Sequence, residues 1–106
     1  MAFNTEVSTS YKCVVDGIIF EGKLPKSALS QFDIYTAMLA YWESKTPATW
    51  ATVKNYIVAN TKCVEEKTGI ELKVEDLNFH QIKLMVDRYL TMAAEFFTSP
   101  QEKKAQ

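Results

Sequence analysis

A β-hairpin centred on Asp16-Gly17 is the feature that most constrains how this chain can fold. The dipeptide lies between two short apolar runs in the stretch "KCVVDGIIFE". Asp-Gly is favoured in two-residue type I′ turns because both central positions need a positive φ. With these residues at the turn, the predicted cross-strand pairs are Val15 with Ile18, Val14 with Ile19, Cys13 with Phe20, and Lys12 with Glu21. Because a hairpin alone is marginal in water, this one must pack on helices or join a larger sheet.

The two faces of the predicted hairpin differ in character. Side chains alternate between the faces of a strand, so one face is apolar and carries Tyr11, Cys13, Val15, Ile18 and Phe20. The other face mixes charged and apolar residues, namely Lys12, Val14, Ile19 and Glu21. We expect the apolar face to seal the helices. The mixed face is either a modest solvent face or the start of an interface that includes Val14 and Ile19.

A first helix is predicted over about residues 28–44. Its apolar side chains recur at helical spacing along one stripe: Phe32, Tyr35, Leu39 and Trp42. Further apolar residues widen that stripe to most of the circumference: Ile34, Met38 and Tyr41. Ser30 and Asp33 have the spacing of a capping box, so the helix is expected to begin at Ser27 or Ser30. A helix that is apolar on so many sides is central to a core or shared with a partner.

Two more helices are predicted, over about residues 47–68 and 79–97. Thr46-Pro47 begins the second, since Thr is a good N-cap and Pro is tolerated at the first helical position. Its expected stripe is Trp50, Val53, Ile57, Thr61 and Val64, and Gly69 fits the left-handed position after its end. Asn78 and Gln81 form a capping box at the start of the third helix. The segment from Ile70 to Val74 alternates like a short strand, and the pattern leaves open whether it joins the hairpin.

These elements predict an α+β fold, mostly helical, with an N-terminal β-hairpin packed on three α-helices. The 106 residues suffice for one domain over residues 1–106, with the hairpin at about residues 7–24. The polar residues 99–106 are expected to form a disordered tail.

Composition argues against several classes of partner. The formal net charge is -1 and no basic stripe is visible, which argues against nucleic acid. No apolar run approaches the roughly 20 residues that span a bilayer, and residues 1–10 lack the pattern of a secretory signal. Cys13 and Cys63 are far apart in the sequence, and two free thiols are favoured over a disulfide. We therefore expect a cytoplasmic protein, in the host cytoplasm if it is viral.

No catalytic or metal-binding pattern stands out. His80 is the one histidine, and no orienting partner or nucleophile can be proposed for it from the sequence. The carboxylates have no recognisable ligand spacing, and with three glycines a phosphate cradle is very unfavourable. The expectation is a protein that is not an enzyme, with no cofactor, no metal and no small-molecule substrate.

The aromatic residues are the most informative group. The chain has two Trp, five Tyr and six Phe, and these serve either a packed core or an interaction surface. The second interpretation predicts a protein that binds a protein partner or itself, as a homo-oligomer. The predicted partner-binding residues are Tyr41, Trp42, Trp50, Val14 and Ile19.

The layout of the chain resembles the short tail-assembly chaperones of long-tailed bacteriophages. The stretch "VVDGIIFEGKLP" looks like the opening of some members, and "EFFTSPQEKKAQ" resembles their polar ends, where Glu102-Lys103-Lys104 could be encoded by an A-rich slippery run. The resemblance implies a small, largely helical protein that coats a tape-measure protein during tail assembly. It would act through helix surfaces and the hairpin edge rather than through a pocket.

Two other classes of function stay open at this point. One is a small phage- or host-encoded inhibitor that binds and blocks a larger protein machine. The other is an enzyme or small-ligand carrier, with Cys63, His80 and carboxylates meeting in a pocket. A measured native mass separates an assembly protein from a monomeric inhibitor, and a reactive thiol would support the enzyme.

Overall fold

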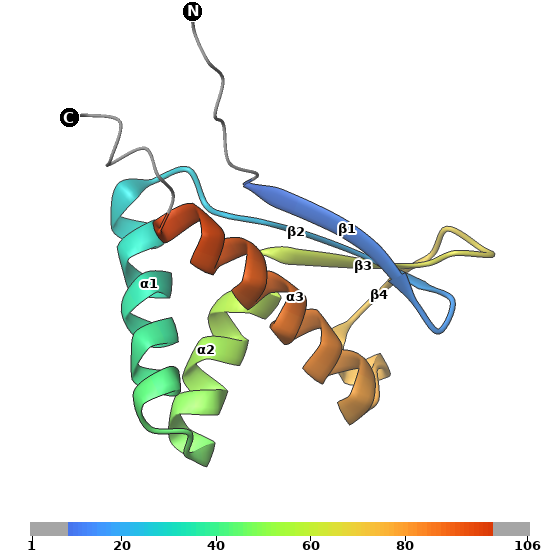
Figure 1. The fold of residues 1–106 in the computed structure, drawn as a ribbon. Coiled ribbons are helices and arrows are strands. Elements are labelled where there is room, and N and C mark those ends of the chain that lie inside the picture. The colour runs from blue at the N-terminus through green and yellow to red at the C-terminus, as the bar shows by residue number, and fades with distance from the viewer. Residues whose placement is uncertain (1–8, 99–106) are drawn as a thin grey trace, which may run out of the picture.

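A computed structural model describes residues 9–98, which form two layers (Figure 1). One layer is an antiparallel sheet of order β1-β2-β3-β4, comprising β1 Ser10–Val15, β2 Ile18–Lys23, β3 Thr61–Glu65 and β4 Glu71–Leu72. The other layer holds α1 Ala28–Glu43, α2 Pro47–Ala59 and α3 Phe79–Phe97, with a short 3-10 helix, η1, at Val74–Asp76. The predicted fold class, α+β and mostly helical with the hairpin on three helices, is confirmed. The predicted tail at 99–106 and hairpin positions 7 and 8 lie outside the described residues.

The hairpin has the predicted turn and register. Asp16 and Gly17 have φ values of 53° and 78°, and Val15 pairs with Ile18. Phe20 is fully buried on the face that meets α3, whereas Val14 is 53% exposed on the opposite face. The expectation that one face seals the helices is therefore confirmed.

The prediction of a single helix over residues 47–68 is wrong. The helix α2 ends at Ala59, and residues 61–65 leave it to form β3 beside β2. Thr61 and Val64 continue the helical spacing of α2, but both are β-branched and suit a strand equally well. The strand is preferred because the second edge of β2 needs backbone partners, and because Cys63 becomes buried opposite Phe20.

Gly69 serves a strand connection instead of a helix end. Its φ is +73°, as a left-handed position requires, but it lies in the turn between β3 and β4. The Gly69 N–H donates to the carbonyl of Glu65 at 2.8 Å. The segment from Ile70 to Val74, which the sequence left open, contributes the two residues of β4, and these pair with β3 and not with the hairpin.

The helix α1 buries a different side from the predicted stripe. Its buried residues are Ile34, Ala37 and Met38, while Phe32, Leu39 and Trp42 are exposed. Apolar residues surround most of this helix, so spacing within α1 cannot select the side that meets the other helices. Its N-cap is Ser27, whose hydroxyl accepts from the Ser30 N–H at 3.3 Å. The capping box expected at Ser30 and Asp33 is wrong.

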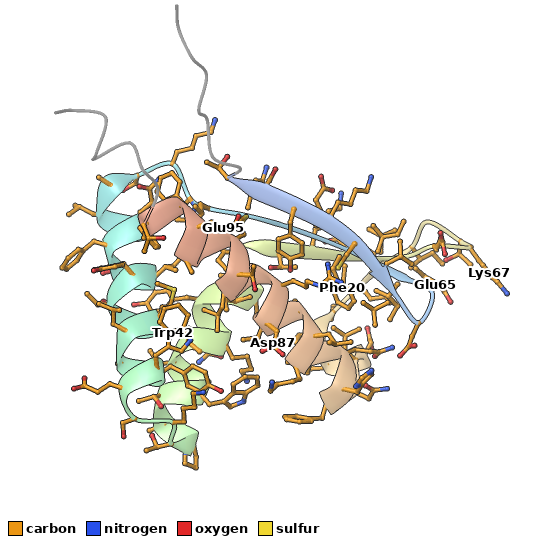
Figure 2. All side chains as sticks on the ribbon, in the orientation of Figure 1. Phe20, Trp42, Glu65, Lys67, Asp87 and Glu95 are labelled. Atoms are coloured by element: carbon orange, nitrogen blue, oxygen red, sulfur yellow. The ribbon has the colours of Figure 1, made fainter. Side chains whose placement is uncertain are left out.

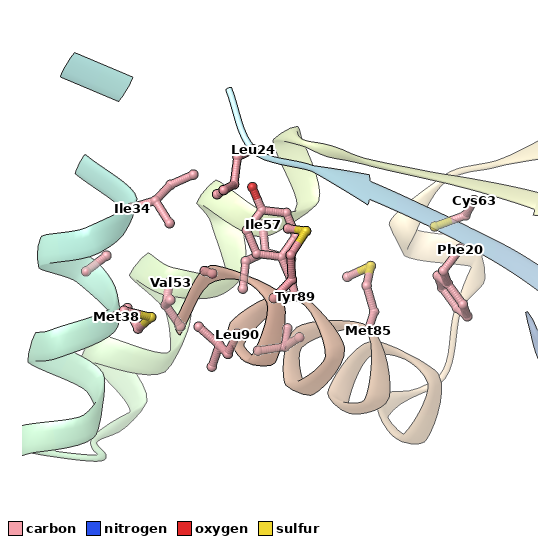
Figure 3. Close-up of a cluster of buried hydrophobic side chains, with 14 of the residues drawn as sticks. Phe20, Leu24, Ile34, Met38, Val53, Ile57, Cys63, Met85, Tyr89 and Leu90 are labelled. Carbon is pink, nitrogen blue, oxygen red and sulfur yellow. The ribbon is translucent and has the colours of Figure 1, made fainter. Parts of the chain in front are cut away.

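The core lies between the sheet and the helices, and α3 forms its centre (Figure 3). The predicted bounds of α3 and its capping box at Asn78 and Gln81 agree with the structure. Two tyrosines join the layers by hydrogen bonds. The hydroxyl of Tyr89 donates to the carbonyl of Lys23 at 2.8 Å, and that of Tyr11 donates to the carbonyl of Met85 at 3.2 Å. Their rings meet edge to face, with centroids 6.3 Å apart.

Candidate functional site

Three of the five predicted partner-binding residues meet where α1, α2 and α3 converge. Tyr41 and Trp42 come from the end of α1, and Trp50 comes from the first turns of α2. Two hollows of about 430 and 350 Å³ adjoin here and share Tyr41, Lys45 and Lys83. We call this surface the aromatic groove and define it by Tyr41, Trp42, Lys45, Trp50, Phe79, Lys83, Asp87, Leu90, Ala94 and Glu95.

One wall of the aromatic groove is a row of rings. The centroid of Trp50 lies 6.0 Å from that of Tyr41 and 6.1 Å from that of Phe79. Trp50 and Tyr41 also pack against the core, whereas Phe79 is 68% exposed. Rings anchored on one side and open on the other suit a contact surface, because they lose little conformational entropy when a partner covers them.

The link between α1 and α2 holds this row in place. The Thr46 hydroxyl accepts from the Thr49 N–H at 3.1 Å, and the Thr49 hydroxyl donates to the carbonyl of Ser44 at 2.6 Å. Pro47 occupies the first helical position. Together these bonds fix the angle at which α2 leaves the link, and hence the position of Trp50 one turn later.

The charges of the aromatic groove differ between its ends. Lys45 holds its ammonium 5.7 Å from the ring centroid of Tyr41. Lys83 pairs with Asp87 at 3.0 Å, and this hydrogen bond raises the pKa of Lys83. Figure 2 shows Asp87 and then Glu95 farther along α3, with Trp42 on α1 facing the same region. Because Lys83 and Asp87 neutralise each other, the remaining charges among the groove residues are Lys45 near the α1–α2 link and Glu95 toward the end of α3.

An apolar stripe on the outside of α1 continues the aromatic groove. Its members are exposed by 42 to 79%: Leu29, Phe32, Leu39 and Trp42. We call them the outer α1 stripe. These four residues are the exposed large apolar side chains of α1. Trp42 belongs to both the stripe and the groove, so the two surfaces are continuous.

The other two predicted residues, Val14 and Ile19, lie apart from the aromatic groove. They pair with each other across the hairpin on the face of the sheet away from the helices, and Ile19 also pairs with Val64 of β3. The structure therefore separates the five predicted residues into two surfaces.

The residues considered for an enzyme or carrier occupy different surroundings. Cys63 is buried, and burial raises the pKa of its thiol, which favours the unreactive protonated form. His80 is exposed in the first turn of α3. Within residues 9–98, no group of three or more His, Cys, Asp and Glu side chains could hold a metal ion. Over the same range, no helix has the length and apolar character for crossing a membrane.

Phe79 was not among the predicted partner-binding residues, although it lies in the aromatic groove. Phe79 fits the apolar spacing of α3, but it is the first helical residue, beyond the part of α3 that the other elements cover. Leu29 was not singled out at all. Its position one turn before Phe32, on the outer α1 stripe, was the available signal.

Comparison with known proteins adds no relative to this picture. No family model, curated protein or solved structure matches the chain.

Proposed function

We propose that this chain is a non-enzymatic protein-binding and assembly protein that holds an apolar helix of its partner. Trp42 carries the proposal, because it is 44% exposed and joins the aromatic groove to the outer α1 stripe. An amphipathic helix presents apolar residues at intervals of three and four, and such a ridge fits a groove lined by aromatic anchors. The acidic and basic ends of the groove would orient that helix.

The tail-assembly chaperone is the specific form of this proposal. Its partner would be a tape-measure-like protein, and the surface on α1 supports this because it offers apolar area without an enclosed pocket. Self-association through the outer α1 stripe would make the protein a homo-oligomer when the partner is absent. A cytoplasmic location belongs to the same proposal and is supported by the two free thiols.

The test compares Trp42→Ala with Tyr56→Ala. Both residues are partly exposed aromatics on helices, but Tyr56 lies outside the aromatic groove. The measurements are native mass across a concentration series and the affinity for a synthetic amphipathic helix. We expect Trp42→Ala to weaken both self-association, as measured by native mass, and helix binding by at least about tenfold. A loss of this size is typical of an interface anchor. Tyr56→Ala should leave both close to wild type.

Three results would count against parts of this proposal. If neither variant changes mass or affinity, the groove is not the binding surface. If Trp42→Ala unfolds the domain and the Leu29→Ser variant keeps the oligomeric state of the wild type, the interface idea fails. A monomer that still binds the helix would instead favour the inhibitor.

Gene sequence tests the chaperone form separately. An A-rich slippery heptamer within the codons for Pro100–Gln106, followed by an open −1 or +1 frame, would support it. A plain stop followed by an unrelated gene would weaken it, while the binding proposal would stand or fall on the groove variants.

A further inference from the structure

The strand β1 ends the strand order, so within residues 9–98 nothing pairs with its outer edge. The register shows which backbone groups point outward. Val15 and Ile18 close the two-residue turn, and the Leu24 N–H donates to the carbonyl of Thr9 at 2.8 Å. Since hydrogen-bonded and non-hydrogen-bonded pairs alternate in an antiparallel ladder, every second residue of β1 directs its N–H and C=O away from β2. These residues are Ser10, Lys12 and Val14.

A repeated triplet defines the pattern of the sheet. Residues 12–14 of β1 and residues 62–64 of β3 both read Lys-Cys-Val, and they flank residues 19–21 of β2, which read Ile-Phe-Glu. The outer face therefore carries two rows across the strands. One row alternates in charge and contains Lys12, Glu21 and Lys62. The other is apolar and contains Val14, Ile19 and Val64.

We propose that the outer edge of β1 accepts an extended segment of a partner protein as an added antiparallel strand. The segment carries a β-branched apolar residue opposite Val14 and an acidic residue opposite Lys12, two positions later in its own sequence. Such a segment repeats, on the outer edge, the pairing that Ile19 and Glu21 make on the inner edge. Each cross-strand pair contributes roughly 0.2–1 kcal/mol, and the ladder of backbone bonds contributes the rest.

Space beside β1 suits the inward-facing side chains of such a segment. A hollow of about 240 Å³ lies between β1 and α3, and Tyr11, Arg88 and Met92 are among the residues that line it. Side chains opposite Tyr11 and Cys13 would point to the side on which α3 lies. An added strand would therefore cover part of this hollow as well as the edge.

A second copy of β1 fits this edge poorly. Within β1, a face-matched antiparallel pair of two copies places Lys12 opposite the Lys12 of the second copy or opposite its Val14, because a register with Val14 opposite Val14 would need Asp16, which lies in the turn with a φ of 53°. The first pairing sets like charges together, and the second leaves both rows mismatched. Charge complementarity thus favours a different protein with the apolar-x-acidic pattern over self-pairing at this edge.

The experiment uses two short capped peptides and charge-reversed variants of the full chain. One peptide carries isoleucine and glutamate two positions apart, and the matched peptide has lysine in place of glutamate. Binding is measured by the slowing of amide hydrogen exchange at Ser10, Lys12 and Val14. We expect the glutamate peptide to bind roughly fivefold more tightly, the ratio that about 1 kcal/mol of pairing energy gives.

Lys12→Glu and Lys62→Glu form the decisive pair of variants. Both residues lie opposite Glu21, so both changes perturb the same row, but only Lys12 borders the open edge. Lys12→Glu should reverse the preference between the two peptides, and Lys62→Glu should not. Val14→Pro removes an outward N–H and should therefore abolish binding of both peptides. The variant should still fold, because proline is tolerated at a strand edge.

The proposal fails if neither peptide slows exchange at these amides, or if Lys12→Glu leaves the peptide preference unchanged. It also fails if the edge amides become protected without peptide as protein concentration rises, because a second copy would then occupy the edge. Should Val14→Pro unfold the domain, the two lysine variants still decide. Trp42→Ala should leave peptide binding at the edge intact, so this test and the groove test can fail separately.

Discussion

Cys13 and Cys63 face the same side of the sheet, each opposite Phe20, with β2 between them. Neighbouring strands are about 4.8 Å apart, so the two Cα atoms are separated by roughly 10 Å. A disulfide needs Cα atoms within about 7 Å. The sequence favoured two free thiols only because the cysteines are far apart in the chain and a cytoplasmic location was expected. The separation of the two strands now gives a geometric reason.

The thiols should differ in reactivity in the folded protein. Cys13 is half-buried, whereas Cys63 is buried with the pKa of its thiol raised. We expect alkylation of the native protein without reductant to modify Cys13 first, and unfolding in denaturant to expose both. Mass spectrometry of the labelled chain provides the measurement. A mass lower by two hydrogens, with no labelling after unfolding, would contradict the separation of the two strands.

Gly22→Ala should destabilise the fold. A Cβ at Gly22 would lie 2.5 Å from Cε1 of Tyr11 and 3.0 Å from Cδ2 of Tyr89. Tyr11 cannot simply move away, because its hydroxyl donates to Met85 and its ring meets Tyr89 edge to face. Overpacking of this kind costs about 1–3 kcal/mol. Urea unfolding measures the cost, and Tyr11→Leu in the same chain should recover part of it.

Stability should fall at high pH because of Tyr11 and Tyr89. Burial is the largest cause that raises the pKa of each phenol above its ordinary value of 10.0. The unfolded chain therefore loses these protons first, and the folded state is favoured fully below pH 10 but progressively less above it. Each group contributes a slope of at most about 1.4 kcal/mol per pH unit.

Tyr89→Phe isolates one of the two phenols in this titration. The variant loses the hydrogen bond to the carbonyl of Lys23, so it should be less stable at neutral pH. Its stability should then decline less steeply than that of the wild type between pH 10 and 11.5. Equal slopes for the two proteins, measured by urea unfolding, would show that Tyr89 ionises equally well in both states.

Asn78→Ala should cost more than Ser27→Ala. The Asn78 side chain accepts from the Gln81 N–H at 2.9 Å, and the Gln81 side chain accepts from the Asn78 N–H at 2.9 Å. Ser27 makes a single cap bond of 3.3 Å, without the reciprocal bond. We expect losses of about 1 kcal/mol for Asn78→Ala and less for Ser27→Ala. Chemical denaturation compares the free energies of unfolding of the two variants. Equal losses would show that the reciprocal bond of the capping box adds no stability.

Elements with strong local signals were predictable from the sequence. Asp16-Gly17 determined the hairpin and its register, because a two-residue turn with positive φ leaves one way to pair the flanking residues. Asn78 and Gln81 determined where α3 begins, and its predicted range of about 79–97 agrees with the structure. For the candidate site, the sequence identified Tyr41, Trp42 and Trp50 by residue type, without any indication that they meet.

The repeated Lys-Cys-Val triplet was a signal for β3 that helical spacing concealed. Residues 61–65 satisfy the period of a helix and the composition of a strand, so local energetics leave the two nearly balanced. The unfilled edge of β2 decides between them, and that edge exists only once the hairpin has formed. A strand at 61–65 satisfies backbone groups that a longer α2 would leave without partners.

The sequence by itself determined the turn, the caps that begin α2 and α3, and an excess of apolar surface on α1. Tertiary structure decided which side of α1 is buried, since α2 and α3 cover Ile34 and Met38 and leave Phe32 and Trp42 to solvent. Turns and caps depend on bonds within a few residues, so local sequence specifies them. The choice of a buried face, and with it the aromatic groove, depends on the neighbours that the rest of the chain brings, because burial is a property of packed elements and not of one helix.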